Sequence, residues 1–386
     1  MKRSLVALSV LAAASGAHAQ TVEDLQKQID ILASEIESLK QSETSNSPLA
    51  NISIGGYGEH HYNNYRDTES GPQKDDMVDA HRFVLFFGYD YSDSVRFFSE
   101  LEVEHAYSGE GKPGAVELEQ AYIEVDTSDT TRVKGGLFLV PVGILNETHE
   151  PDTFYGVERN KLENQIIPTT WWETGVWFTQ DLGAGLSYDL AFHSGLLVED
   201  DYEIRGGRQK SAKANANDGA WTGRVRYVGL PGLDMAVTYQ RQNDIHQSAL
   251  DGDLGFAGDV PDAKAELLEA HARYTIGGLQ LTAMHAAWDI DSDAAEATGQ
   301  DEQSGEYVEA GYKLFDELGV FARHTQYDLA ERDDQESEVL VNTYGVNYWV
   351  HPQVVLKADY QNVNYKDASK DDKVDDSVNL GIGWSF

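Results

Sequence analysis

Hydrophobic and small polar residues alternate strictly along the last ten residues of the chain. The apolar positions in residues 377–386 are Val378, Leu380, Ile382, Trp384 and Phe386. A period of two is the pattern of a strand with one buried face, and about ten residues is the length of a strand that crosses a membrane. The polar face carries only serine, asparagine and glycine, whereas a soluble sheet usually exposes charge. The pattern therefore predicts a final membrane strand that ends on an aromatic residue.

The same alternation runs backwards through the chain as a series of hairpins. Short, turn-forming connections lie near 92–94, 127–129, 181–184, 230–232, 277–278, 316–317 and 351–352. Long and mostly acidic connections lie near 64–78, 107–115, 141–170, 197–218, 244–263, 291–303, 329–337 and 366–374. Because short and long connections alternate, the pattern predicts an all-β chain that forms a 16-stranded antiparallel transmembrane β-barrel.

The third long connection, residues 141–170, differs from the others because apolar residues punctuate it. These include Ile144, Leu145, Phe154, Ile166 and Ile167. A loop of this length in a compact body is usually functional or disordered, and its apolar content argues against disorder. We therefore expect a folded, functional loop.

The N-terminal region has two further patterns. Residues 1–19 combine Lys2 and Arg3 with a short apolar run and a small-residue cleavage pattern, which predicts a secretory signal peptide rather than an ordinary hydrophobic helix. Residues 21–42 place apolar residues alternately three and four positions apart, which predicts a short coiled coil. A single amphipathic helix lying on the body is the alternative. Residues 43–50 are expected to be a linker, and residues 51–386 to form the barrel.

Composition narrows the classes of function. The 386 residues carry 29 Lys and Arg against 66 Asp and Glu, a formal net charge of −37. This balance argues against nucleic acid as a partner. The absence of cysteine excludes disulfides, thiolate metal sites and cysteine nucleophiles.

A family resemblance covers most of the chain after residue 50. The stretch LVPVGILNETHEPDTFYGVERNKLENQIIPTTWWETG, residues 139–175, with EQAYIEV and VKGGLF before it, resembles the phosphate-selective porin O/P-like family. Dicarboxylate porins with an N-terminal coil are similar in layout, and the terminal Phe386 resembles the assembly signal of bacterial outer-membrane barrels. The resemblance implies a homotrimer in the outer membrane of a Gram-negative bacterium, with the coil in the periplasm. It also implies surrounding lipid and lipopolysaccharide, and a third loop that narrows the pore.

The charge distribution suggests the selectivity of such a pore. The long loops hold most of the acids, whereas the predicted strands hold many of the bases. A lipid-facing Arg or Lys costs about 2–4 kcal/mol at the bilayer midplane, so these bases should face the lumen. The expected pore-lining and constriction residues are Arg82, Glu147, Glu150, Glu158, Arg159, Lys161, Arg224, Arg226, His271, Arg273, Arg323 and Lys357. We expect a passive channel for small hydrophilic solutes that favours anions such as phosphate or dicarboxylates. If these bases only neutralise wall carboxylates, a non-selective or cation-preferring diffusion porin results.

Other chemistry has weak support in the sequence. His60 and His61 point to opposite faces of a strand, and His149 between Glu147 and Glu150 lacks the ligand spacing of structural zinc. We therefore expect no metal site and no cofactor. No nucleophile motif appears, so an enzyme or an adhesin embedded in the barrel is the weaker hypothesis.

Overall fold

The computed structural model describes residues 50–65, 75–250, 253–256, 258–331, 337–366 and 376–386. The chain divides into two units, residues 1–52 and 53–386, and the barrel lies in the second apart from its first residue, Ile52. The predicted signal peptide and coiled coil lie outside the described residues, as does the linker apart from residue 50. Among the described residues, no helix is both long and apolar enough to cross a membrane.

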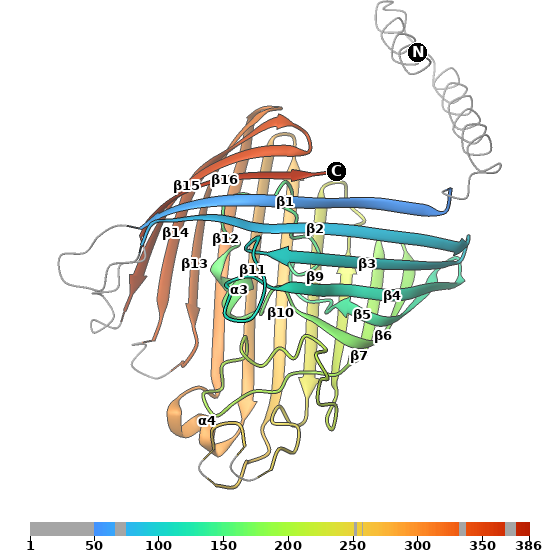
Figure 1. Ribbon diagram of the computed structural model, residues 1–386, viewed down its shortest axis with the longest axis vertical. Helices are drawn as coiled ribbons and strands as arrows, with labels where there is room; N and C mark the ends of the chain where they lie inside the picture. The colour runs from blue at the N-terminus through green and yellow to red at the C-terminus, as the bar shows by residue number, and fades with distance from the viewer. Residues whose placement is uncertain (1–49, 66–74, 251–252, 257, 332–336, 367–375) are drawn as a thin grey trace, which may run out of the picture. The chain divides into compact units, whose positions relative to one another are not determined.

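Sixteen antiparallel strands in the described residues close into one barrel, with β16 paired to β1 (Figure 1). The strands are β1 Ile52–Tyr65, β2 Met77–Ser92, β3 Val95–Glu104, β4 Val116–Ser128, β5 Thr131–Leu139, β6 Trp172–Gly183, β7 Leu186–His193, β8 Ala220–Tyr227, β9 Leu233–Gln242, β10 Lys264–Ile276, β11 Leu279–Asp291, β12 Glu302–Phe315, β13 Leu318–Asp328, β14 Val339–His351, β15 Val354–Tyr365 and β16 Ser377–Ser385. Two short helices, α3 Lys161–Gln165 and α4 Asp293–Thr298, interrupt the connections. The all-β prediction and the count of sixteen are confirmed.

Short turns and long loops alternate around the barrel as the sequence predicts. The turn at residues 277–278 coincides with the gap between β10 and β11, and the third long loop spans residues 140–171. Each strand is held by antiparallel ladders on both sides, so every strand edge in the described part is paired. Closure satisfies the backbone groups that an open sheet would leave exposed to lipid.

The strands alternate between an apolar outer face and a polar inner face. In β8, Trp221 and Val225 are exposed on the outside, while Thr222 and Arg224 are buried on the inside. The outward residues have apolar side chains because they meet lipid, and the inward ones are polar because they line the lumen. The predicted parity of Arg224 is therefore confirmed.

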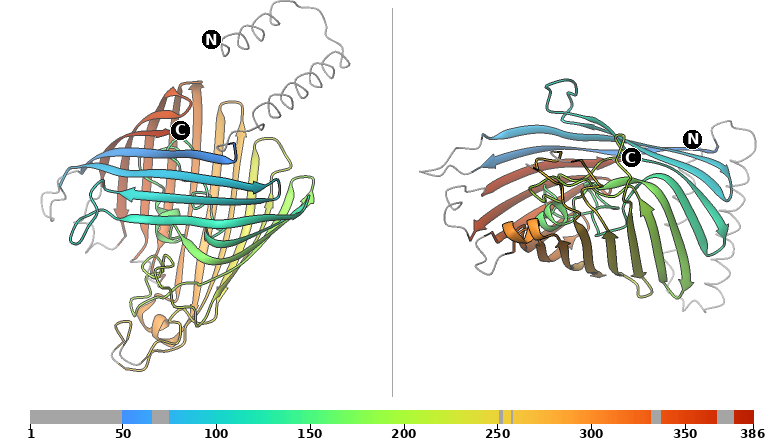
Figure 2. Two further views of the ribbon diagram at one scale, coloured as in Figure 1. Left: turned by 45° about the vertical axis from the view of Figure 1, so that its right-hand side comes forward. Right: turned by 90° about the horizontal axis from the view of Figure 1, so that it is seen from below.

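Part of the lumen is filled by an apolar core. The third loop contributes Ile144, Leu162 and Trp171, and residues 196–204 of the next long loop pack against the same cluster. The inner faces of β10 and β11 complete it with Leu267 and Trp288. Helix α3 contacts β12 and β13 inside the ring of strands (Figure 2). The third loop therefore folds into the barrel, and its apolar residues pack in a core there.

Candidate functional site: the constriction inside the barrel

Helix α3 is fixed by a local cap. Asn160 accepts a hydrogen bond from the Glu163 backbone N–H at 2.8 Å, and its own side-chain amide donates to Glu163 Oε1 at 3.0 Å. The first bond satisfies one backbone donor that the first turn of a helix leaves free, and the second links the two side chains. The sequence Asn-x-x-Glu therefore starts the helix inside the lumen.

The carboxylate of Glu163 also joins distant parts of the third loop to the barrel wall. Its Oε2 accepts hydrogen bonds from the backbone N–H groups of Ile144 at 2.8 Å and Leu145 at 2.5 Å. Its Oε1 accepts a hydrogen bond from the Tyr307 hydroxyl on β12 at 3.1 Å. Because Glu163 is fully buried, these charge-assisted bonds hold the loop in one position.

The folded loop leaves a cavity of about 270 Å³ between itself, the β1–β4 wall and the long loop that follows β7. Charged side chains surround this cavity, which we call the constriction cavity. They are Glu59, Arg82, Glu104, Glu117, Glu119, Glu158, Arg159, Lys161, Arg205, Arg208 and Lys210, with His61, His81 and His105. Few apolar side chains line it, so it suits a hydrated, charged solute.

One side of the constriction cavity carries three arginines on the two loops. Arg205 donates to the carbonyls of Asn164 and Thr169, both at 2.7 Å, which fixes its guanidinium against the third loop. Arg208 donates to the Thr170 carbonyl at 2.7 Å. Arg159 donates to the Thr170 hydroxyl at 3.0 Å, while its Nε and Nη2 have no hydrogen-bond partner among the described residues.

The three guanidinium groups repel one another. Burial lowers the pKa of Arg205, and the neighbouring charges of Arg208 and Arg159 lower it further. Within the described part of the chain, none of the three forms an ion pair with a carboxylate. Their positive charge is therefore directed towards whatever enters the cavity.

The opposite side carries carboxylates that are already paired. The His61 ring lies between Glu59 and Glu158, with each ring nitrogen 3.1 Å from a carboxylate oxygen. Because an ionised carboxylate only accepts, both ring nitrogens donate, and His61 carries a positive charge. Arg82 contacts Glu59 at 2.8 Å and Glu102 at 3.8 Å. These contacts compensate Glu59 and Glu158, and Lys210 pairs with Glu117 at 2.6 Å, while Glu104 and Glu119 also line the cavity.

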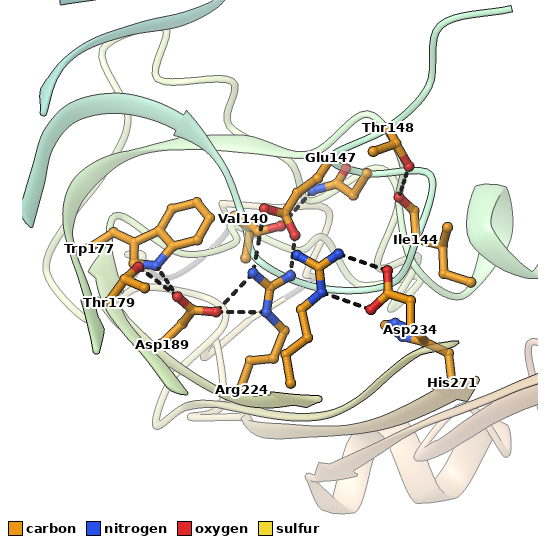
Figure 3. A network of polar contacts seen from close by, with 12 residues as sticks. Val140, Ile144, Glu147, Thr148, Trp177, Thr179, Asp189, Arg224, Asp234 and His271 are labelled. Carbon is orange, nitrogen blue, oxygen red and sulfur yellow. Dashed lines mark hydrogen bonds and ion pairs between the residues drawn. The ribbon is translucent and has the colours of Figure 1, made fainter. Parts of the chain in front are cut away.

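Four of the predicted pore residues line this cavity, namely Arg82, Glu158, Arg159 and Lys161. Three predicted bases in strands point into the lumen but are neutralised there. Arg224 contacts Asp189 at 2.8 Å and also contacts Glu147 (Figure 3). Arg226 contacts Asp234 at 2.7 Å, and Arg323 contacts Glu309 at 2.6 Å.

The remaining predicted residues are dispersed. His271 is buried against Glu269 at 2.7 Å. The Lys357 ammonium lies 3.7 Å from the Phe154 ring centroid, a favourable cation–π distance. Arg273 faces the lumen from β10, and Glu150 lies on the third loop. The constriction cavity does not include these four.

Sequence reasoning missed Arg205, Arg208 and Lys210. The sequence predicts an acidic loop at residues 197–218, because Glu199, Asp200, Asp201 and Glu203 lie near its start. The local signal was the run RGGRQK at 205–210, which follows those acids directly. What the sequence did not show is that this run contacts the third loop.

Three groups of histidines and acids converge on the β1–β4 wall. Ligating atoms lie within 4.8 Å of one another in His61–His81–Glu158, Asp79–His81–His105 and Glu100–Glu119–His149. Burial lowers the pKa of His149, but the carboxylates of Glu100 and Glu119 raise it more, to about 9. The sequence neighbours Glu147 and Glu150 are not part of this group, because the partners of His149 come from β3 and β4.

Comparison with known proteins gives the same fold and a family. A protein of Aquifex aeolicus (strain VF5), described only as uncharacterized, is 30% identical over 381 aligned residues, covering 87% of this chain and 80% of that protein. Among solved structures, the anion-selective porin from Comamonas acidovorans has a TM-score of 0.58 at 13% identity, covering 87% of this chain and 99% of that one. The outer-membrane channel DcaP of Acinetobacter baumannii has a TM-score of 0.59 at 14% identity, covering 87% of this chain and 97% of that one.

A third similar structure is the trimer form of OmpT of Vibrio cholerae, with a TM-score of 0.54 at 14% identity, covering 87% of this chain and 98% of that one. At these identities the solved structures establish the fold. The family model for Gram-negative porins matches residues 7–368, nearly the whole chain. The protein therefore belongs to the Gram-negative porins and resides in the outer membrane.

Proposed function

We propose that this porin is a passive channel for small hydrophilic solutes whose constriction favours anions. The observation that carries the proposal is the set of three arginines, Arg159, Arg205 and Arg208, which face the constriction cavity without ion-pair partners in the described residues. The facing carboxylates Glu59 and Glu158 are already paired with His61. A permeating anion therefore meets uncompensated positive charge at the narrowed part of the lumen.

The strand bases alone would support a different function. Arg82, Arg224, Arg226 and Arg323 each have a carboxylate partner, so they contribute little net field. If the loop arginines did not lie on the permeation path, the same barrel would be a non-selective or cation-preferring diffusion porin. The position of the loop arginines favours the anion channel.

The solutes and partners follow from the resemblance and from the charge. At neutral pH phosphate carries one or two negative charges and dicarboxylates carry two, which suits a cluster of three guanidinium groups. We further propose a homotrimer surrounded by outer-membrane lipid and lipopolysaccharide. The similar OmpT of Vibrio cholerae has a trimer form. A trimer would also hold three of the predicted N-terminal coils close together.

The test is the reversal potential across a planar bilayer under a KCl gradient. We expect chloride to be more permeant than potassium for the wild type. A charge about 6 Å from an ion in water changes its energy by roughly 0.7 kcal/mol, about threefold in permeability. The combined Arg159→Gln, Arg205→Gln and Arg208→Gln changes should therefore remove the chloride preference or reverse it.

Two controls separate the constriction from the rest of the lumen. Lysine at the same three positions keeps the charge and should keep the preference. Arg96→Gln makes the same change in charge next to a short turn, where Arg96 is paired with Glu124 at 2.7 Å. Arg96→Gln should shift the reversal potential less than glutamine at any one of the three loop arginines does.

Clear cation selectivity of the wild type would refute the anion proposal. Competition by phosphate and succinate in single-channel recordings then distinguishes the solutes.

A further inference from the structure

A second cluster of polar groups lies behind the constriction cavity, where the third loop meets the β3–β4 wall. His149 of the loop, Glu100 of β3 and Glu119 of β4 are all at least 97% buried. Their facing atoms, His149 Nε2, Glu100 Oε1 and Glu119 Oε2, have no hydrogen-bond partner in the described residues. A buried polar atom without a partner destabilises the folded state, and the more so if it is charged. Three such atoms at one point therefore suggest a missing ligand.

The distances have the dimensions of a metal site. His149 Nε2 lies 3.4 Å from Glu100 Oε1 and 3.5 Å from Glu119 Oε2, too far for well-formed hydrogen bonds. A single N–H also points in one direction and cannot satisfy both oxygens. A tetrahedral zinc ion with bonds of about 2.0–2.1 Å separates its ligand atoms by roughly 3.3–3.4 Å. One ion between the three atoms would satisfy all of them at once.

A β-bulge brings the two glutamates together. Glu100 pairs with Gln120 and Leu101 pairs with Leu118, so Glu119 is an extra residue without a ladder partner. The bulge turns Glu119 and Gln120 towards the lumen together, although consecutive residues of a regular strand face opposite sides. Gln120 then donates to Glu100 Oε2 at 2.7 Å, which leaves Oε1 directed at His149. Such a bond orients a ligand in the way that outer-shell partners do at metal centres.

The surroundings favour a cation. The two carboxylates of Glu100 and Glu119 lie near Glu102, which is also buried and lacks a hydrogen-bond partner, and Arg82 contacts Glu102 only at 3.8 Å. The buried hydroxyl of Tyr57 has no partner either, and the Tyr57 ring packs edge-on against His149 at 5.8 Å between centroids. Glu119 also lines the constriction cavity, so an ion can arrive from the lumen.

The donor set selects the class of metal. Imidazole nitrogen with two carboxylates suits zinc and neighbouring transition metals, whereas calcium and magnesium prefer oxygen ligands alone. We propose that Glu100, Glu119 and His149 form a binding site for a divalent transition metal of the zinc type. Bound there, the ion links the third loop to two strands of the wall and fixes one side of the constriction.

The test uses the full-length protein refolded in detergent. It is equilibrated with zinc chloride, dialysed against metal-free buffer and analysed for zinc by mass spectrometry. We expect the wild type to retain zinc at this site, and His149→Gln and Glu119→Gln each to lose about one zinc per chain. His81→Gln is the matched control, because His81 belongs to the two other histidine clusters and not to this one. It should not remove the zinc bound by His149.

A second measurement does not depend on the variants folding. Crystals of the wild type soaked in zinc chloride should show an anomalous difference peak about 2 Å from His149 Nε2. Excess magnesium chloride in the soak should not displace the bound zinc. Absence of a peak at His149, or zinc retention that His81→Gln abolishes and His149→Gln leaves intact, would overturn the proposal.

Discussion

At the scale of single residues, the third loop is held to the wall by a few charged contacts. Glu158 is one of them, with Oε1 at 3.1 Å from His61 Nδ1 and 3.0 Å from the Asn63 side-chain amide. Burial raises the pKa of Glu158, but the hydrogen bond from His61 lowers it more, to well below its usual range. The Glu158 carboxylate therefore binds a proton more weakly in the folded protein than in the unfolded chain.

This pKa gives stability a dependence on pH. Because the pKa of Glu158 is lower in the folded state, the ionised carboxylate adds to the free energy of unfolding. This contribution is complete above the pKa of the unfolded chain, about 4.3, and is lost as the pH falls below that value towards the pKa of the folded state. The Glu158 side chain is 35% exposed, so solvent screening limits the contribution to about 1 kcal/mol. Glu158→Gln should lower the melting temperature at pH 7, and the difference from the wild type should shrink at pH 3.

Thermal unfolding followed by circular dichroism in detergent measures this difference. Glu150→Gln is the control in the same loop, because Glu150 forms no ion pair within the described residues, and this change should leave the melting temperature close to that of the wild type. A difference between wild type and Glu158→Gln that is as large at pH 3 as at pH 7 would show that the charge of Glu158 does not hold the loop.

At the scale of elements, the third loop docks where inward positions of the wall are glycine. The Tyr155 ring packs between Gly311 of β12 and Gly319 of β13, with Phe321 and Trp349 around it. A Cβ at Gly311 would lie 2.2 Å from the Tyr155 ring, closer than any real contact. The wall therefore has a recess shaped for one loop side chain.

Filling this recess should loosen the loop. Gly311→Ala forces Tyr155 out of its position, and overpacking of this kind costs about 1–3 kcal/mol. We expect a lower melting temperature and an altered single-channel conductance. Gly223→Ala is the matched control in β8, because the nearest atom to its added Cβ is 3.5 Å away. If Gly311→Ala behaves like Gly223→Ala in both measurements, the recess does not position the loop.

At the scale of the whole barrel, stability depends on closing the seam between β1 and β16. Nine residue pairs from Tyr57↔Ser385 to Tyr65↔Ser377 form this ladder. Phe386 extends it, donating to the Gly56 carbonyl at 2.9 Å and accepting from the Gly56 N–H at 3.0 Å. The aromatic residue that ends the sequence is therefore also part of the closure.

Deleting Phe386 removes two backbone hydrogen bonds from the seam, at about 0.5–1.5 kcal/mol each. Phe386→Ala keeps both bonds and loses only the ring, which stacks on Phe83 at 6.4 Å. We expect the deletion to lower the melting temperature of the refolded barrel more than the substitution does. Equal effects of the two would mean that the ring, and not the backbone, closes the seam.

The fold was predictable because its determinants are local. Alternation of apolar and polar residues specifies which face of each strand meets lipid, and turn residues mark the hairpins. The alternating short and long connections specified sixteen strands, and the apolar residues of the third loop indicated that it is ordered. Arg224 is buried on the inner face, as the alternation in its strand predicts, whereas Arg82 begins a segment that is apolar on both faces, so parity did not decide its position.

The arrangement of charges was decided only by the tertiary structure. Arg224 meets Glu147, 77 residues away, and His149 meets Glu100 and Glu119 across two elements, so no sequence window contains either contact. The bulge at Glu119 also breaks the period of two on which parity rests. The sequence therefore determined the barrel and which residues face its interior. Folding of the third loop into the lumen decided which of those charges have an ion-pair partner in the described residues and which do not, because pairing depends on distances between residues far apart in the chain.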